Sequence, residues 1–211
     1  MANRRPLTEN AQVKQRQVVE AAARLFAERS FSGVSMEDVA EASGLAKPSL
    51  YHYFPGKAQI LHQIHLQFIF PLLESARERA QSGMPAGDEL RAIIHDVLFL
   101  SAEKAGYLRT FNEHLRDLEA EAYLEVSGHR DEYRDIVEAA IRRGVENGEF
   151  TVEDPRIAAL TLLGSLVWSY QWLRSDRPRS VADVAEAIWR TFLYGLQGPG
   201  SNGAGPKRPR R

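Results

Sequence analysis

The 211-residue sequence contains no cysteine, so the chain has no disulfide framework, no thiolate zinc site and no cysteine nucleophile. No apolar run approaches the roughly 20 residues that a membrane helix needs. The first 15 residues are too polar for a signal peptide. These absences predict a cytoplasmic protein with no membrane partner.

Strand-like alternation and familiar catalytic motifs are also missing. No stretch alternates apolar and polar residues convincingly, which favours an all-α fold. The sequence has no G-x-S-x-G, no G-x-x-x-x-G-K and no H-E-x-x-H, so we expect no enzyme, no catalytic residues and no cofactor. His62 and His65 are one helical turn apart and the other histidines are scattered, which does not favour a metal site.

Charge is distributed unevenly along the chain, although the net charge is only −1. Residues 1–57 carry 8 basic and 6 acidic side chains, residues 58–196 carry 15 and 22, and the last 15 residues carry 4 basic and none acidic. A mildly basic front before an acidic body suggests that the front of the chain meets a polyanion.

Capping residues, prolines and glycines predict about nine helices. The apolar spacing of Val19, Ala22 and Phe26 indicates a helix over about 10–29. Further helices are predicted after a Ser35–Asp38 capping box, from Pro48, over 57–81 with a bend near Pro71, after an Asp88 N-cap, around 133–141 with an end at Gly144 or Gly148, after Asp154-Pro155, and after Ser180 with Asp183. We expect a flexible arm over 1–13 and a disordered basic tail over 197–211.

The most informative segment is VSMEDVAEASGLAKPSLYHYFPGK, residues 34–57. Two short helices joined through Gly44-Leu45 carry apolar residues at spacings that close a three-helix core with Phe26. This pattern predicts a helix-turn-helix over 14–56, whose second helix can enter a major groove of DNA. Donors and flat apolar faces point outward, with no acidic residue between Ala42 and Phe70.

The residues LF-x-E-x-x-F, S-x-x-D-V-A-x-x-x-G-L and KPSLYHYF-x-x-K resemble the tetracycline-repressor (TetR) family of bacterial transcription regulators over about residues 14–74. Two positions depart from the family pattern. Ser30 replaces the usual glycine after the first helix, and Ala46 replaces a serine or threonine that would supply a phosphate contact.

The resemblance implies a set of DNA-contacting residues. Ser35, Tyr53 and Lys57 match phosphate-contacting positions, and His52 can contact a phosphate as well. The residues at groove-facing positions are Lys47, Pro48, Ser49 and Tyr51. Lysine can donate to guanine, while proline and tyrosine can touch thymine methyl groups. The alternatives are core packing for the two tyrosines and a solvated surface for the two lysines.

The layout of residues 57–196 resembles the effector-binding and dimerisation domains of the family. From Ile157 to Leu173 the predicted helix is apolar nearly all round, so it must be covered on every side. We expect a homodimer interface built from this helix and the last one, with Leu166, Ile188, Trp189 and Phe192 in it. The alternative is a single buried helix in a monomer.

Aromatic residues concentrate in the same region and can line an apolar pocket for a small hydrophobic effector. The candidates are Phe68, Phe99, Phe111, Tyr133, Trp168 and Trp172, although each alone suits plain core packing. The C-terminal half resembles the family's acyl-CoA-responsive subgroup, and Arg174, Arg177 and Arg179 can meet a coenzyme's phosphates.

The sequence thus predicts a ligand-responsive repressor that binds a palindromic double-stranded DNA operator as a homodimer. For the effector, a multidrug-type sensor of aromatic or cationic compounds is the alternative to an acyl-CoA sensor. For the function class, the alternative is a helical scaffold that binds no DNA.

Overall fold

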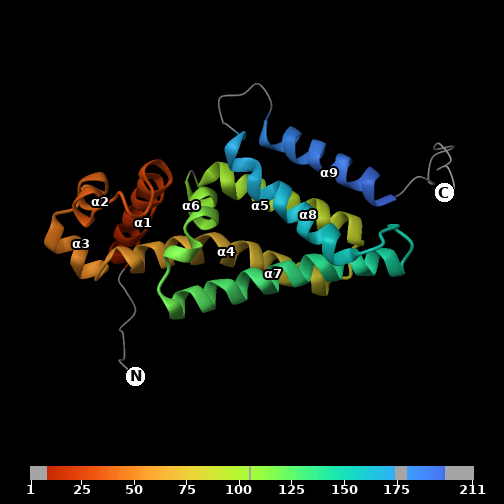
Figure 1. The fold of residues 1–211 in the computed structure, drawn as a ribbon, viewed down its shortest axis with the longest axis horizontal. Coiled ribbons are helices and arrows are strands. Elements are labelled where there is room, and N and C mark those ends of the chain that lie inside the picture. Colours follow the sequence, from red (N-terminus) through yellow and green to blue (C-terminus); the bar gives the residue numbers. More distant parts are fainter. Residues whose placement is uncertain (1–8, 105, 174–179, 198–211) are drawn as a thin grey trace, which may run out of the picture. The chain divides into compact units, whose positions relative to one another are not determined.

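The computed structural model describes residues 9–104, 106–173 and 180–197 of the chain (Figure 1). Within those ranges it contains nine α-helices, two short 3-10 helices and no strand, so the all-α prediction is confirmed. The α-helices are α1 (Glu9–Arg29), α2 (Met36–Ala42), α3 (Lys47–Tyr53), α4 (Lys57–Ser82), α5 (Ala86–Glu103), α6 (Tyr107–Glu113), α7 (Ala120–Glu146), α8 (Pro155–Val167) and α9 (Val181–Gln197). The 3-10 helices are η1 (Leu115–Asp117) and η2 (Trp168–Gln171). None of the helices described is long and apolar enough to cross a membrane.

Three helices begin where the local sequence predicts. The Ser35 hydroxyl accepts from the backbone N–H of Asp38, and the Asp38 carboxylate accepts from the backbone N–H of Ser35 at 2.7 Å, which completes the capping box of α2. The Asp154 carboxylate accepts from two backbone N–H groups in the first turn of α8, at 2.9 and 3.1 Å. Ser180 and Asp183 form the same reciprocal pair at α9. Each cap satisfies backbone donors that the helix itself leaves unpaired.

The start of α5 differs from the prediction. The helix begins at Ala86, so Asp88 lies inside its first turn and is not the N-cap. The carboxylate of Glu149 accepts from the backbone N–H groups of Ala86 at 3.3 Å and Gly87 at 3.1 Å. The start of α5 is therefore capped by Glu149, more than sixty residues away in the sequence, and not by Asp88 as predicted.

One other helix end needs correction, because the apolar helix predicted over 157–173 ends at Val167 and continues only as the 3-10 turn η2. Of the two ends predicted for the helix around 133–141, the one at Gly148 is confirmed. Helix α7 passes through Gly144, where a Cβ would lie 2.2 Å from the ring of Phe150, and ends at Glu146, just before the positive φ of Gly148. Residues 9–13, predicted as part of a flexible arm, belong to α1. The rest of that arm, the three arginines at 174, 177 and 179, and the tail from 198 lie outside the described residues.

The chain divides into two units. Unit 1 comprises residues 1–70 and 103–128, and unit 2 comprises residues 71–102 and 129–211. Unit 1 therefore holds α1 to α3, the first part of α4, α6 and the start of α7. Residue 57, the predicted domain boundary, is the first residue of α4, and it falls inside unit 1 because this unit includes α4 as far as Phe70.

The core of unit 1 includes the predicted three-helix cluster. Phe26, Val39, Leu50 and Phe54 are at most 4% exposed, while Leu45 is half-buried. The ring of Phe31 meets that of Phe26 edge to face with centroids 5.2 Å apart. This core fixes α2 and α3 against α1 (Figure 1).

Unit 2 is built on α5, α7, α8 and α9. The buried side chains of its core include Leu90, Ile93, Ile94, Val137, Ile141 and Leu162. Helix α9 lies along α5, where the Trp189 ring contacts the start of α5 at Gly87 and Arg91 pairs with Glu186 at 2.7 Å. This packing holds α8 and α9 side by side (Figure 1).

Candidate nucleic-acid interface and effector site

Helix α3 presents the predicted groove-facing set to solvent. Pro48 lies in its first turn, where a missing N–H costs no hydrogen bond. The exposed residues of this set are Lys47, Pro48, Ser49, Tyr51 and His52, and Tyr53 is half-buried. Tyr51 is 43% exposed, so its ring is not a core residue. The turn before α3 passes through Gly44 at a φ of +67°, a conformation that favours glycine.

Lys47, the predicted guanine contact, is paired with a carboxylate. Its ammonium group donates to Glu37 in the first turn of α2, and the two side chains are 54% and 57% exposed. The hydrogen bond from Lys47 lowers the pKa of the Glu37 carboxyl, and the same bond raises the pKa of Lys47. The stretch without acidic residues begins only at Ala42, and the carboxylate that reaches Lys47 comes from the preceding helix.

Lys57, predicted to contact a phosphate, is held inside unit 1. Its ammonium group donates to the backbone carbonyl oxygens of Phe31 at 2.7 Å and Val34 at 2.8 Å. It also lies 4.3 Å from the centroid of the Phe31 ring. Lys57 therefore fastens the loop between α1 and α2 to the start of α4.

Ser35 is likewise engaged locally, since its hydroxyl donates to Asp38 at 2.5 Å within the capping box. Ser30 adopts a positive φ of 64°, a backbone conformation that normally favours glycine. That observation explains physically why a glycine is the more usual residue at this point of the pattern.

Helix α6 is joined tightly to α1 within unit 1. Gly106 precedes α6 at a φ of +87°, and a Cβ there would lie 2.7 Å from the carbonyl oxygen of Ala23. The buried Thr110 hydroxyl donates to the same oxygen at 3.2 Å. The Tyr107 hydroxyl donates to the side chain of Gln67 on α4 at 3.2 Å. A shift of α6 or of this part of α4 would therefore act directly on the helix that supports α2 and α3.

The predicted effector contacts are divided between the two units. Phe68 and Phe111 are buried in unit 1 with ring centroids 4.9 Å apart. Tyr133 is buried in unit 2, and burial raises the pKa of its hydroxyl. Phe99 and Trp168 are surface residues, 46% and 58% exposed.

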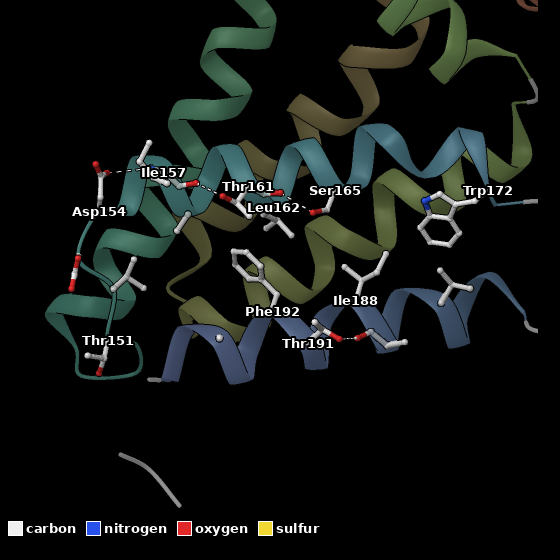
Figure 2. A pocket seen from close by; sticks show the side chains of 16 residues that line it. Thr151, Asp154, Ile157, Thr161, Leu162, Ser165, Trp172, Ile188, Thr191 and Phe192 are labelled. Carbon is white, nitrogen blue, oxygen red and sulfur yellow. Dashed lines mark hydrogen bonds between the residues drawn. The ribbon is translucent and has the colours of Figure 1, made fainter. Parts of the chain in front are cut away.

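Trp172, the sixth predicted effector contact, lines a groove of about 980 Å³ between α8 and α9 (Figure 2). Figure 2 shows Phe192 and Ile188 of α9 facing Leu162 and Thr161 of α8 across it. The hydroxyl groups of the lining Thr161, Ser165 and Thr191 donate to carbonyl oxygens of their own helices at 2.8, 2.8 and 2.9 Å. With these groups satisfied, the groove presents a largely apolar surface.

The predicted interface residues lie on α8 and α9 but differ in burial. Leu166 is fully buried and Trp189 is 7% exposed, so both pack inside the single chain. Ile188 and Phe192 are half-buried and line the groove. The most exposed apolar side chains of the two helices are others, namely Ile157, Leu160 and Tyr194, at 57%, 45% and 60%.

Unit 2 also contains two ion pairs, one of which includes a buried carboxylate. Glu89 of α5 is fully buried and accepts from Arg143 of α7, and Arg79 of α4 pairs with Asp96 of α5. Burial raises the pKa of Glu89, and Arg143 opposes that shift. The paired residues are separated by 17 and 54 positions, so no local motif signals either pair. Among the described residues no group of three or more potential metal ligands is found.

Two family models match the chain. The first, described as "Bacterial regulatory proteins, tetR family", covers residues 18–64 and therefore α2 and α3. The second, "Tetracyclin repressor-like, C-terminal domain", covers residues 83–196, more than half of the sequence. The chain belongs to the TetR family. It is therefore a DNA-binding transcription regulator with a helix-turn-helix domain and a ligand-binding domain, and not an enzyme.

Individual TetR-family proteins are similar over most of their length. The HTH-type transcriptional repressor KstR2 of Rhodococcus jostii is 26% identical over 87% of this chain and 91% of its own. The structure of PfmR from Thermus thermophilus is 31% identical, covers 85% of this chain and 98% of its own, and has a TM-score of 0.77. A structure of AibR in complex with isovaleryl coenzyme A and operator DNA is 25% identical over 88% of this chain and 99% of its own, with a TM-score of 0.72.

Proposed function

We propose that this TetR-family regulator is a homodimeric repressor that leaves a palindromic operator when it binds a small hydrophobic effector, specifically an acyl-CoA. The observation that carries the DNA part is the exposed face of α3, where Lys47, Ser49 and Tyr51 stand free of the core. A short helix presented in this way can lie in a major groove and touch base edges. The proposed site of action is the cytoplasm, where bacterial DNA lies.

The dimer surface in this proposal is the outer face of α8 and α9. Ile157, Leu160 and Tyr194 are exposed on these two helices, and apolar side chains such as Ile157 and Phe192 line the groove between them. A second copy of the chain suits this face, because helices that place the same apolar surface on a two-fold axis bury it in both subunits. Two copies of α3 related by that axis would read the two halves of a palindrome.

The proposal that the effector is an acyl-CoA is supported by proteins similar to this chain. AibR, which is similar to this chain over almost its whole length, is described in complex with isovaleryl coenzyme A and operator DNA. KstR2 is named a repressor, which supports repression as the direction of control. Within the chain, Phe68 and Phe111 form a buried aromatic pair, and the proposal places the acyl chain beside it.

In this proposal, the contact between α6 and α1 couples effector binding to DNA binding. Thr110 and Gly106 hold α6 on the carbonyl of Ala23, and α1 supports the helix-turn-helix. An effector that displaces α6 therefore changes the position of α3, so that DNA and effector oppose each other through one coupling free energy.

A titration of the preformed operator complex tests the proposal. Isovaleryl-CoA and longer acyl-CoA thioesters should release the DNA, whereas free coenzyme A should not, because it lacks the apolar part. If only planar cationic dyes release the operator, the effector is of the multidrug type and the acyl-CoA proposal is wrong. If the protein prefers no DNA sequence at all, the repressor proposal itself fails.

A further inference from the structure

Helix α3 carries one permanently charged side chain, Lys47, and the structure does not leave that charge free. The ammonium group is hydrogen-bonded to Glu37, a residue ten positions earlier on α2. Both side chains are more than half exposed, so this pair lies on the same surface that would face DNA. Lysine at this position therefore meets DNA together with a carboxylate.

We propose that Glu37 is a specificity-determining residue, which neutralises Lys47 on non-operator DNA and so confines its contribution to the correct base sequence. This inference rests on the proposed reading of the operator by α3. Glu37 is a positioning residue in this scheme, because it acts through Lys47.

The charge balance of the two helices supports this role. The carboxylate of Asp38 is committed to the capping box and pairs with Arg29 at 3.5 Å. Glu41 is exposed and forms no ion pair within the part of the chain that the structure describes. Of the three acidic residues in α2, only Glu37 is bonded to the reading helix.

The weakness of an exposed ion pair makes an exchange of partners possible. Pairs of this kind contribute little to folding, since water solvates both charges well. A phosphate offers Lys47 only another anion, and it also repels Glu37. A guanine in the groove offers two neutral acceptors, O6 and N7, so Lys47 can donate to the base and still keep Glu37 as a partner. The pair thus opposes random phosphate contacts more than the specific base contact.

The test compares Glu37→Gln with a matched variant, Glu41→Gln, which removes the same charge one turn further along α2. The probes are a duplex selected from a random pool by binding to the protein, and a scrambled duplex of equal length and composition. Affinity for each is measured between 50 and 200 mM salt by fluorescence anisotropy.

For Glu37→Gln we expect affinity for the scrambled duplex at 50 mM salt to rise about threefold or more. Its salt dependence should steepen by about 0.9 in log–log slope for each subunit, the value for one additional phosphate contact. Affinity for the selected duplex should change less, so the ratio of the two affinities falls. Glu41→Gln should change both affinities less than twofold, and thermal unfolding should be the same in both variants.

A double variant separates an action through Lys47 from a general charge effect. In a Lys47→Gln background, Glu37→Gln should no longer raise the affinity for scrambled DNA. The inference is overturned if Glu37→Gln behaves like Glu41→Gln, if its effect persists undiminished without Lys47, or if it weakens the selected duplex more than the scrambled one. A wild-type protein that does not distinguish the two duplexes would instead refute the proposed function, and this inference with it.

Discussion

Gly106→Ala would strain the joint between α6 and α1, and the structure gives the size of the effect. Gly106 has a φ of +87°, a conformation that costs a residue with a Cβ about 1–2 kcal/mol. The new Cβ would lie 2.7 Å from the carbonyl oxygen of Ala23, where ordinary contacts begin at 3.4 Å. The oxygen belongs to the backbone of α1 and the new Cβ is bonded directly to the backbone before α6, so α6 has to move away from α1.

That movement also stretches the 3.2 Å hydrogen bond from the buried Thr110 hydroxyl to the same oxygen, which adds about 1 kcal/mol or more. We therefore expect Gly106→Ala to lower the free energy of unfolding by about 2–4 kcal/mol in urea titrations. Gly83→Ala is the matched control, because Gly83 has a φ of +73° but no atom within 4 Å of its Cβ position. It should lose only the conformational cost of about 1–2 kcal/mol. Equal losses in the two variants would refute the close packing of α6 on α1.

Three further predictions concern other contacts. Arg143→Met leaves Glu89 buried without its partner and should cost about 3 kcal/mol at pH 7. Burial raises the pKa of the Glu89 carboxyl, so its ionisation destabilises the folded state once the pH rises above the ordinary glutamate pKa of 4.5. The free energy of unfolding lost in Arg143→Met should therefore be smaller at pH 5 than at pH 7. A loss that is independent of pH in urea titrations would contradict this prediction. Leu160→Glu should give a folded monomer in sedimentation, because the side chain is exposed, whereas Leu166→Glu should unfold the chain; a dimer that persists in Leu160→Glu contradicts the proposed interface. Lys57→Ala should lower the free energy of unfolding by about 1–3 kcal/mol, as measured in urea, since two carbonyl groups lose their donor; unchanged stability would show that Lys57 does not fasten the loop.

The sequence predicted correctly the helix starts that depend on hydrogen bonds between neighbouring residues. The caps at Ser35, Asp154 and Ser180 join atoms within three residues of one another, so their residue types were sufficient. The cap of α5 was predicted wrongly because its acceptor, Glu149, comes from a distant part of the chain. A sequence pattern cannot show which of two suitable carboxylates the fold will place at a helix start.

In the candidate site, too, features set by one helix were predicted, whereas contacts between helices were not. The exposure of Tyr51 followed from the helix-turn-helix pattern, but the ion pair of Lys47 with Glu37 joins two helices and depends on their crossing. Periodicity also could not tell which apolar residues of α8 and α9 face inward. The sequence therefore predicts Leu166 and Trp189 in a dimer interface, whereas both are buried within the single chain.

The most direct test of the central claim, that α3 reads the operator, is the operator affinity of Tyr51→Ala. The side chain is 43% exposed and its ring is not needed for the core, so the variant should unfold at the same temperature as the wild type. A lost groove contact should weaken binding to the selected duplex roughly 5- to 140-fold and leave binding to scrambled DNA nearly unchanged. An operator affinity equal to that of the wild type would contradict the claim.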